Sequence, residues 1–265
     1  MPLPKPSPNQ TVVITGASSG IGVELAKNLA ERGYNLTLVA RRIDRLEALA
    51  NELEEARGIE ARAIATDLAD ATARVGLVAE LEQGPAVAGL CNNAGFGIFG
   101  RLDGNDPESE REMVEVNIVA VHDLTVRLLP GMVERGAGAV LNTASTAGFQ
   151  PLPGMATYSA SKAFVLTFSE ALSADLSNSG VSCTALCPGP VRTEFSEVAG
   201  NAGLEDSMPS FTVVEASEVA RQAVDGMLKG SRTVIPGIAN RATAIGGRLA
   251  PRSLVLPIAA RFTKR

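Results

Sequence analysis

The sequence predicts an α/β protein built on a doubly wound parallel sheet with helices on both faces. Two observations predict this fold class: short apolar stretches rich in β-branched residues alternate with longer helical stretches, and glycine or polar residues bound the apolar stretches. Strands that are buried on both faces of a sheet read as short, continuous apolar runs. Helical stretches of this length suit right-handed crossovers between parallel strands.

The expected elements follow one another in strict alternation from residue 10 onward. Strands are expected at Thr11–Thr15, Leu36–Ala40, Ala61–Ala65, Val87–Cys91, Ala139–Thr143 and Val181–Leu186. Helices are expected at Gly22–Arg32, Ile43–Arg57, Ala71–Gln83, Pro107–Arg135 and Thr157–Asn178. A last helix, Glu215–Leu228, leads to a strand near Thr233–Ile235. No linker-like change of composition divides residues 10–236, so we expect one domain, followed by a basic, apolar extension over residues 237–265.

The first nine residues and the cysteines argue against a secretion signal, a disulfide framework and a zinc site. Residues 1–9 carry proline at every second position and lack the apolar run of a secretion signal, so we expect a disordered lead-in. The three cysteines are odd in number and form no CxxC pair, which argues against a disulfide framework or a zinc site and favours a cytoplasmic location. No metal site is expected. The net charge of −5 gives no reason to expect nucleic-acid binding.

A glycine-rich turn follows the first expected strand. Its glycines stand at positions 16, 20 and 22, with Ser18 and Ser19 between them. Glycine allows the sharp turn and lets a diphosphate approach the backbone, while the helix N-terminus supplies free N–H groups and a partial positive charge. An ordinary glycine-rich turn is the alternative. The strand–turn–helix context favours a nucleotide site.

Tyr158 and Lys162 lie four residues apart in an expected helix and therefore share one face. A free phenol has a pKa of about 10, and a nearby ammonium group lowers it. Such a tyrosine can donate a proton to a carbonyl oxygen or take one from an alcohol. Ser145, just past a strand, could hold the same oxygen. A Tyr/Lys pair on a helix surface is common, so the pair alone does not establish a catalytic site.

Taken together, these motifs resemble the short-chain dehydrogenase/reductase family. The order and spacing match for Thr15–Gly22, Asn92–Gly95, Ser145, Tyr158 with Lys162, and Pro188–Gly189. The resemblance covers about residues 10–236 and implies a single Rossmann-type domain. It also implies a homodimer or homotetramer, assembled through the helices expected near residues 107–135 and 157–178.

The resemblance assigns expected roles residue by residue. It implies a catalytic set in which Asn117 anchors a water of the proton relay, Ser145 polarises the carbonyl, Tyr158 is the acid, and Lys162 binds ribose and tunes Tyr158. It implies cofactor contacts by Gly16, Ser19, Ile21 and Gly22 at the diphosphate, with Ser18 and Gly20 in the same turn, Asp67 and Leu68 at the adenine, Asn93, Ala94 and Gly95 behind the fourth strand, and Pro188, Gly189, Val191 and Thr193 at the nicotinamide end.

The end of the second strand predicts the choice of cofactor. In NAD-using members of the family an acidic residue stands at the position of Ala40 and accepts hydrogen bonds from the ribose 2′-hydroxyl. Ala40 cannot accept them, whereas Arg41 and Arg42 offer guanidinium groups that suit a 2′-phosphate. We therefore predict NADP(H). The alternative is that both arginines are solvated residues paired with Asp44 or Glu47.

The segment 194–214 follows the residues expected at the nicotinamide end. It mixes apolar residues with small and polar ones, which suits a mobile lid with an apolar inner face. An apolar or acyl substrate is one interpretation. The other is that any lid over a cofactor needs some apolar residues.

Residues 226–265 carry eight basic residues and no acidic residue. One hypothesis is an amphipathic segment at a membrane surface, or a channel for an anionic acyl carrier or coenzyme. The other is an extra helix pair that packs on the acidic body, or an oligomer contact. We favour the second, because Pro251 and Pro257 interrupt any long helix.

The sequence therefore predicts an NADPH-dependent oxidoreductase that interconverts a carbonyl and an alcohol on a small-molecule substrate. Since a fold does not determine function, a non-catalytic NADP(H)-sensing or scaffold protein on the same fold is the alternative. Dehydration or epimerisation at the same site is a third hypothesis. The complete set of expected catalytic residues favours the oxidoreductase.

Overall fold

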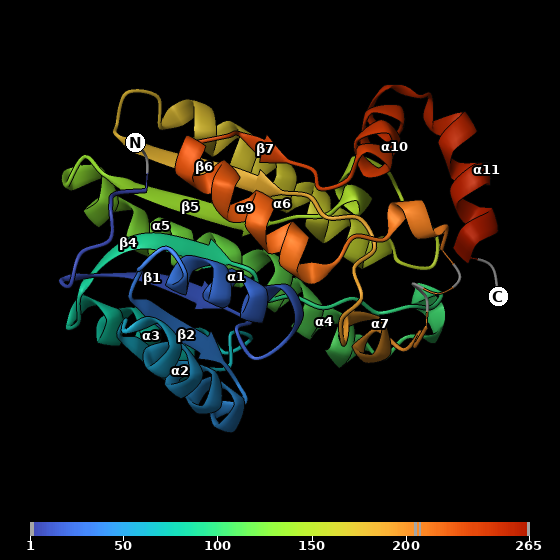
Figure 1. Cartoon of the computed structure of the whole chain (residues 1–265). Coiled ribbons are helices and arrows are strands. Elements are labelled where there is room, and N and C mark those ends of the chain that lie inside the picture. The colour runs from blue at the N-terminus through green and yellow to red at the C-terminus, as the bar shows by residue number, and fades with distance from the viewer. Residues whose placement is uncertain (1–2, 204–205, 207, 264–265) are drawn as a thin grey trace.

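Seven parallel strands form a single sheet in the order β3-β2-β1-β4-β5-β6-β7 (Figure 1). The computed structural model describes residues 3–203, 206 and 208–263. The strands are β1 (Gln10–Thr15), β2 (Leu36–Ala40), β3 (Ala61–Ala65), β4 (Ala86–Asn92), β5 (Gly138–Thr143), β6 (Val181–Leu186) and β7 (Thr233–Val234). The chain runs outward from β1 to β3 and then returns to β4 beside β1, so the strand order reverses there. Ligands of such sheets bind outside the carboxyl ends of the strands at this reversal. The predicted fold class is confirmed.

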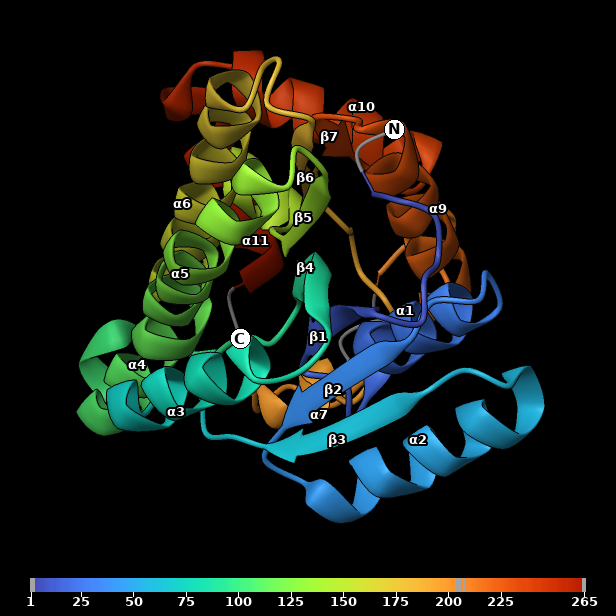
Figure 2. The same cartoon turned by 90° about the vertical axis from the view of Figure 1, so that its left-hand side faces the viewer.

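Helices cover both faces of the sheet (Figure 2). One layer holds α1 (Gly20–Ala30), α2 (Ile43–Arg57) and α9 (Ala216–Lys229), and the other holds α3 (Ala71–Glu82), α5 (Val121–Glu134) and α6 (Ala156–Asp175). β1 shows how the sequence produces two cores: Val12 and Ile14 pack in the first layer, whereas Val13 between them packs in the second. Alternation along a fully buried strand places apolar side chains on both faces.

The helix expected over residues 107–135 contains a change of helix type. It begins as α4 (Pro107–Val114), passes through the π-helical turn η2 (Glu115–Ala120) and continues as α5. By length and composition, Pro107–Glu134 is the one described helix that could cross a membrane, although Leu124 of α5 is buried in the core. The turn η2 carries Asn117, and π turns inside α-helices occur frequently at functional sites.

The start of the described chain is packed against the first helical layer, whereas the sequence predicts disorder over residues 1–9. Leu3 is fully buried in the core, and the Tyr34 hydroxyl donates a hydrogen bond to the Pro4 carbonyl oxygen at 3.0 Å. The described residues 3–9 therefore lie along the body of the protein as a strap. The burial of one leucine and a tyrosine hydroxyl partner hold this strap in place.

Two helices follow β7 at the end of the sheet to which the strands point (Figure 1). They are α10 (Ile238–Leu249) and α11 (Arg252–Thr263), and they form the predicted helical extension. α10 packs against the 3₁₀ turn η3 (Thr146–Phe149) and buries Ala244, while Ile238 and Leu249 face solvent. The extension therefore lies beside the carboxyl edge that carries the site described below.

Candidate active site

The glycine-rich turn between β1 and α1 leaves a helix N-terminus open to an anion. Gly16 and Gly20 adopt left-handed conformations, with φ of 67° and 54°, and α1 begins at Gly20. The side chain of Ser19, which precedes the helix, makes no capping hydrogen bond, so it leaves the first N–H groups without a side-chain partner. A Cβ atom on Gly16 would lie 2.8 Å from the Ala94 Cα atom, too close for any other residue. This close-packed backbone and open helix end suit a diphosphate.

The loop after β4 is held against this turn and against Lys162. The Thr15 hydroxyl accepts hydrogen bonds from the N–H groups of Asn93, at 2.9 Å, and Ala94, at 3.0 Å. A Cβ atom on Gly95 would lie 2.9 Å from the Asn117 side-chain oxygen and 3.2 Å from the Lys162 ammonium nitrogen. Gly95 is therefore the point at which the backbone approaches two polar side chains of the predicted catalytic set.

Asn117 uses its side chain to hold the same loop. Its side-chain oxygen accepts a hydrogen bond from the Phe96 N–H at 3.1 Å, and its amide donates to the Phe96 carbonyl at 2.9 Å and to the Ser161 hydroxyl at 3.1 Å. Asn117 is fully buried. Its side chain therefore joins η2, the β4 loop and α6.

Tyr158, Ser145 and Lys162 meet at the carboxyl end of β5. Burial raises the pKa of Tyr158 to about 12, while a hydrogen bond between the Ser145 and Tyr158 side chains opposes this rise. The Lys162 ammonium nitrogen donates to the Thr143 carbonyl oxygen at 2.8 Å and lies 5.8 Å from the centre of the Tyr158 ring. Burial lowers the pKa of Lys162 to about 8. The structure thus brings all four predicted catalytic residues to one edge of the sheet.

The two arginines after β2 point in different directions. Arg42 contacts the glycine-rich turn, with its Nε atom 3.2 Å and its Nη2 atom 3.1 Å from the Ser18 hydroxyl oxygen. Arg41 instead pairs with Glu112 of α4 at 2.9 Å and is well exposed. Of the two, Arg42 is the one aimed at the crevice.

The residues predicted at the adenine lie at the carboxyl end of β3. The Asp67 side chain accepts a hydrogen bond from the Ala69 N–H at 3.0 Å. The Leu68 carbonyl accepts one from Arg74 at 2.7 Å, and its side chain is buried. Both residues are therefore fixed in place beside the end of β2.

The residues predicted at the nicotinamide end follow β6. The Pro188 carbonyl accepts a hydrogen bond from the Thr146 N–H at 2.9 Å, next to Ser145. A Cβ atom on Gly20 would lie 3.0 Å from the Thr193 methyl carbon. Two further predicted residues of this loop, Gly189 and Val191, lie between them in the sequence. The loop therefore reaches from the catalytic side chains to the glycine-rich turn.

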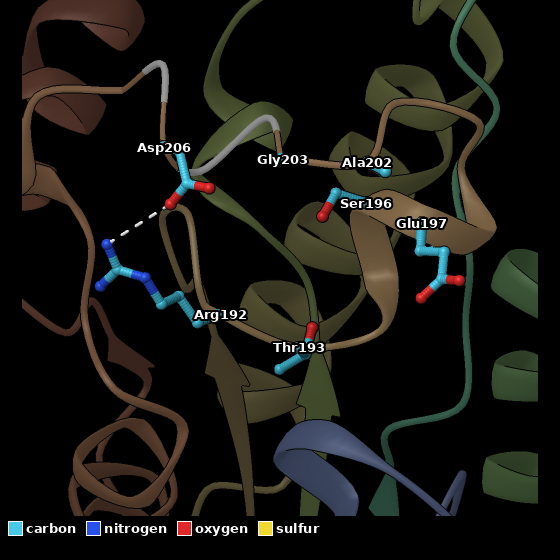
Figure 3. Close-up of a pocket in the computed structure, with 7 residues that line it drawn as sticks. All are labelled: Arg192, Thr193, Ser196, Glu197, Ala202, Gly203 and Asp206. Carbon is cyan, nitrogen blue, oxygen red and sulfur yellow. Dashed lines mark ion pairs between the residues drawn. The ribbon is translucent and has the colours of Figure 1, made fainter.

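Beyond Thr193 the chain forms a small polar pocket of about 240 Å³ (Figure 3). Its lining consists of Arg192, Thr193, Ser196, Glu197, Ala202, Gly203 and Asp206. The Arg192 guanidinium lies 3.8 Å from Asp206 and 3.6 Å from Glu215. Arg192 precedes the predicted lid, and its partners lie within the lid at Asp206 and just after it at Glu215.

Apolar side chains surround Tyr158 on the substrate side. The cluster comprises Met113, Ala147, Met155 and Tyr158, with Phe96, Ile98, Phe99, Leu152 and Phe195 packed against it. The Phe195 ring lies 5.4 Å from the Tyr158 ring, at an angle of 54°. The Phe99 N–H donates to the Ala199 carbonyl at 3.0 Å, which ties the β4 loop to helix α7 (Phe195–Val198). Burial is the cause of the raised Tyr158 pKa, and the Ser145 hydrogen bond lowers it in part.

Comparison with known proteins identifies the family. The model of the short chain dehydrogenase family matches residues 10–202. The chain belongs to this family. It is 37% identical over 217 residues to a sulfoacetaldehyde reductase from Chromohalobacter salexigens, an alignment that covers 80% of this chain and 85% of that protein.

Solved structures of short-chain dehydrogenases agree in fold. One from Sphingobium yanoikuyae, in complex with NADPH, is 34% identical with a TM-score of 0.82, covering 94% of this chain and 95% of that one. One from Burkholderia phymatum, in complex with NAD, is 28% identical with a TM-score of 0.82 and the same coverage of both chains. The chain is therefore an oxidoreductase of the short-chain dehydrogenase family.

The structure adds residues to this site that sequence reasoning missed. Thr143 accepts the Lys162 hydrogen bond, and Ser161 accepts one from Asn117. The sequence offered a clue to both residues, because Thr143 ends an expected strand and Ser161 directly precedes Lys162. Arg45 and Glu194 form an ion pair of 2.7 Å, and no spacing in the sequence indicates that contact.

Proposed function

We propose that this short-chain dehydrogenase is an NADPH-dependent enzyme in which Tyr158 is the general acid and base. The observation that carries the proposal is the buried cluster of Tyr158, Ser145 and Lys162 beside the glycine-rich turn. Such a cluster would offer a proton donor and a cation at the end of β5, one strand beyond the point where the strand order reverses. The open end of α1 suits the cofactor diphosphate, and the absence of a side chain at Gly95 lets the backbone lie close to Lys162.

The side chains divide the work on a bound carbonyl. NADPH, when bound, would supply the hydride. The Ser145 hydroxyl would donate a hydrogen bond to the carbonyl oxygen, and the Tyr158 hydroxyl would give that oxygen its proton. Burial raises the pKa of Tyr158, so the phenol is protonated at neutral pH but is a weaker acid than a free tyrosine until its phenolate is stabilised. The Lys162 ammonium would hold the ribose and stabilise the phenolate formed, while Asn117 keeps the β4 loop in place.

The direct test is NADPH oxidation with a panel of ketones, aldehydes and quinones, followed at the absorbance of the reduced cofactor. Turnover of at least one carbonyl supports the proposal. Tight cofactor binding without turnover on the whole panel would support the sensing alternative. Product formation without net oxidation of NADPH would point to dehydration or epimerisation.

Arg42 is proposed to select NADPH through the 2′-phosphate. Replacing Arg42 by alanine is expected to raise the Michaelis constant for NADPH about tenfold or more and to leave that for NADH nearly unchanged, because a charge-assisted hydrogen bond to phosphate is lost. Steady-state kinetics with both cofactors measures the effect. Arg57→Ala, at an exposed arginine paired with Glu31, is the matched control. An equal change for both cofactors would count against a phosphate contact.

The wall around Tyr158 supports an apolar substrate, either a ketone with hydrocarbon substituents or an acyl chain. Phe96, Met155 and Phe195 pack around the tyrosine, and an ionised substrate group placed among them would lose its hydration. A methyl ketone with a hydrocarbon chain is expected to show at least about tenfold higher kcat/KM than the same ketone ending in a sulfonate. Kinetics on this matched pair checks the prediction. A higher kcat/KM for the sulfonate ketone would contradict an apolar substrate and would agree with the substrate named for the sulfoacetaldehyde reductase relative.

A further inference from the structure

Glu194 holds two arginines at the end of the cofactor crevice. Its carboxylate oxygens lie 3.0 Å from the Arg42 Nη1 atom and 2.7 Å from the Arg45 Nη1 atom. Hydrogen bonds from Arg45 and Arg42 hold the pKa of Glu194 below its ordinary value, so the carboxylate is ionised at neutral pH. Arg42 also contacts Ser18 of the glycine-rich turn. A negative charge of the protein itself thus occupies the guanidinium groups that a cofactor phosphate would need.

The position of Glu194 in the chain connects this ion pair to the catalytic side chains. It follows Thr193, which faces Gly20, and it directly precedes α7. The first residue of α7 is Phe195, whose ring packs on Tyr158. A movement of Glu194 would therefore be transmitted over one peptide bond to the wall of the substrate site.

We propose that Glu194 is a specificity-determining residue that competes with the 2′-phosphate of NADPH for Arg42 and Arg45. This inference rests on the proposed use of NADPH. Arg45 becomes a second phosphate-binding arginine beside Arg42, placed in the first turn of α2. When the phosphate takes the two guanidinium groups, the like charge of the carboxylate is repelled and α7 loses its attachment to α2. Binding of NADPH, and not of NADH, is thereby coupled to the freedom of residues 195–203 at the start of the predicted lid.

The exposure of the three side chains sets the size of the effect. Arg42, Glu194 and Arg45 are 41%, 41% and 46% exposed, so water and salt screen their interaction. Removing the carboxylate charge is therefore expected to strengthen NADPH binding by about three- to fivefold at low salt. The direction of the change decides between two roles for Glu194. A competitor weakens phosphate binding, whereas a residue that merely orients Arg42 strengthens it.

The experiment measures equilibrium dissociation constants of NADPH and NADH by nicotinamide fluorescence. Glu194→Gln is expected to tighten NADPH binding and leave NADH binding unchanged, and the gain should shrink when salt is raised from about 50 mM to about 500 mM. Arg45→Ala should weaken NADPH binding alone. Glu197→Gln is the matched control, since this exposed glutamate lies in α7 and, among the described residues, forms no ion pair with Arg42 or Arg45.

Hydrogen exchange over residues 195–203 tests the coupling to the lid. In the wild type, these amides should exchange faster with NADPH bound than with NADH bound, and in Glu194→Gln the two cofactors should give equal rates. Weaker or unchanged NADPH binding in Glu194→Gln would overturn the inference. If Arg42→Ala leaves the ratio of NADPH to NADH affinity unchanged, the proposed cofactor preference itself fails, which is a separate result.

Discussion

Replacing Tyr158 by phenylalanine is expected to lower kcat/KM by about 10²- to 10⁴-fold, because the proton donor is removed. The substitution deletes one hydroxyl from a side chain that is 9% exposed and leaves the ring contact with Phe195 intact. The fold and the affinity for NADPH should therefore change little. Turnover kinetics on a substrate found in the carbonyl panel, together with cofactor titration, measure both quantities.

The chain supplies a matched control for this substitution. Its other tyrosine, Tyr34, is also buried, and its hydroxyl donates to the Pro4 carbonyl. Tyr34→Phe should lower the free energy of unfolding by about 1 kcal/mol and leave turnover at its wild-type rate. If Tyr158→Phe retained a tenth or more of wild-type kcat/KM, another group would have to handle the proton.

Local patterns explain why the fold could be predicted from the sequence. Every predicted strand is present within a residue or two at each end. For the central strands the reason is that a strand buried on both faces has few alternatives to a short apolar run, whereas the edge strands β3 and β7 are partly exposed. The glycine-rich turn was equally visible, since left-handed φ angles at Gly16 and Gly20 require glycine. Tyr158 and Lys162 share a helix face by their spacing alone.

Contacts between distant segments explain what the sequence did not predict. The π turn at Glu115–Ala120 accompanies the hydrogen bonds of Asn117 to the backbone of Phe96, a contact outside its own helix. Glu194 meets Arg45 across 149 positions of the chain. Neither contact produces a periodic residue pattern from which it could be predicted. The proline-rich start was expected to be disordered because its composition does not reveal that Leu3 finds a place in the core.

Lys162→Met is expected to stabilise the protein at pH 7 by about 2 kcal/mol and to abolish turnover. Burial lowers the Lys162 pKa from 10.5 to about 8, and this shift corresponds to about 3 kcal/mol of unfavourable free energy for the buried ammonium. The lost hydrogen bond to the Thr143 carbonyl offsets about 1 kcal/mol of the gain. Methionine is unbranched and adaptable, so it can fill the space without strain.

The pH dependence separates this cause from a general gain in packing. The pKa of Lys162 is lower in the folded protein than in the unfolded chain. Below pH 8 the ammonium therefore destabilises the folded wild type to its full extent. Between pH 8 and pH 10.5 the folded lysine loses its proton before the unfolded one does, and the wild type gains stability relative to the variant. Urea unfolding at pH 7 and near pH 10 should therefore show the advantage of Lys162→Met shrinking as the pH rises.

Lys5→Met, at an exposed lysine, is the control and should change the free energy of unfolding little at either pH. A wild type more stable than Lys162→Met at pH 7 would mean that the ammonium is well stabilised where it lies. A Lys162→Met variant that is more stable than the wild type but inactive would mean that the ammonium is not well stabilised where it lies. A buried cation that costs the fold stability, and whose removal ends turnover, is present for the chemistry at Tyr158 rather than for the core.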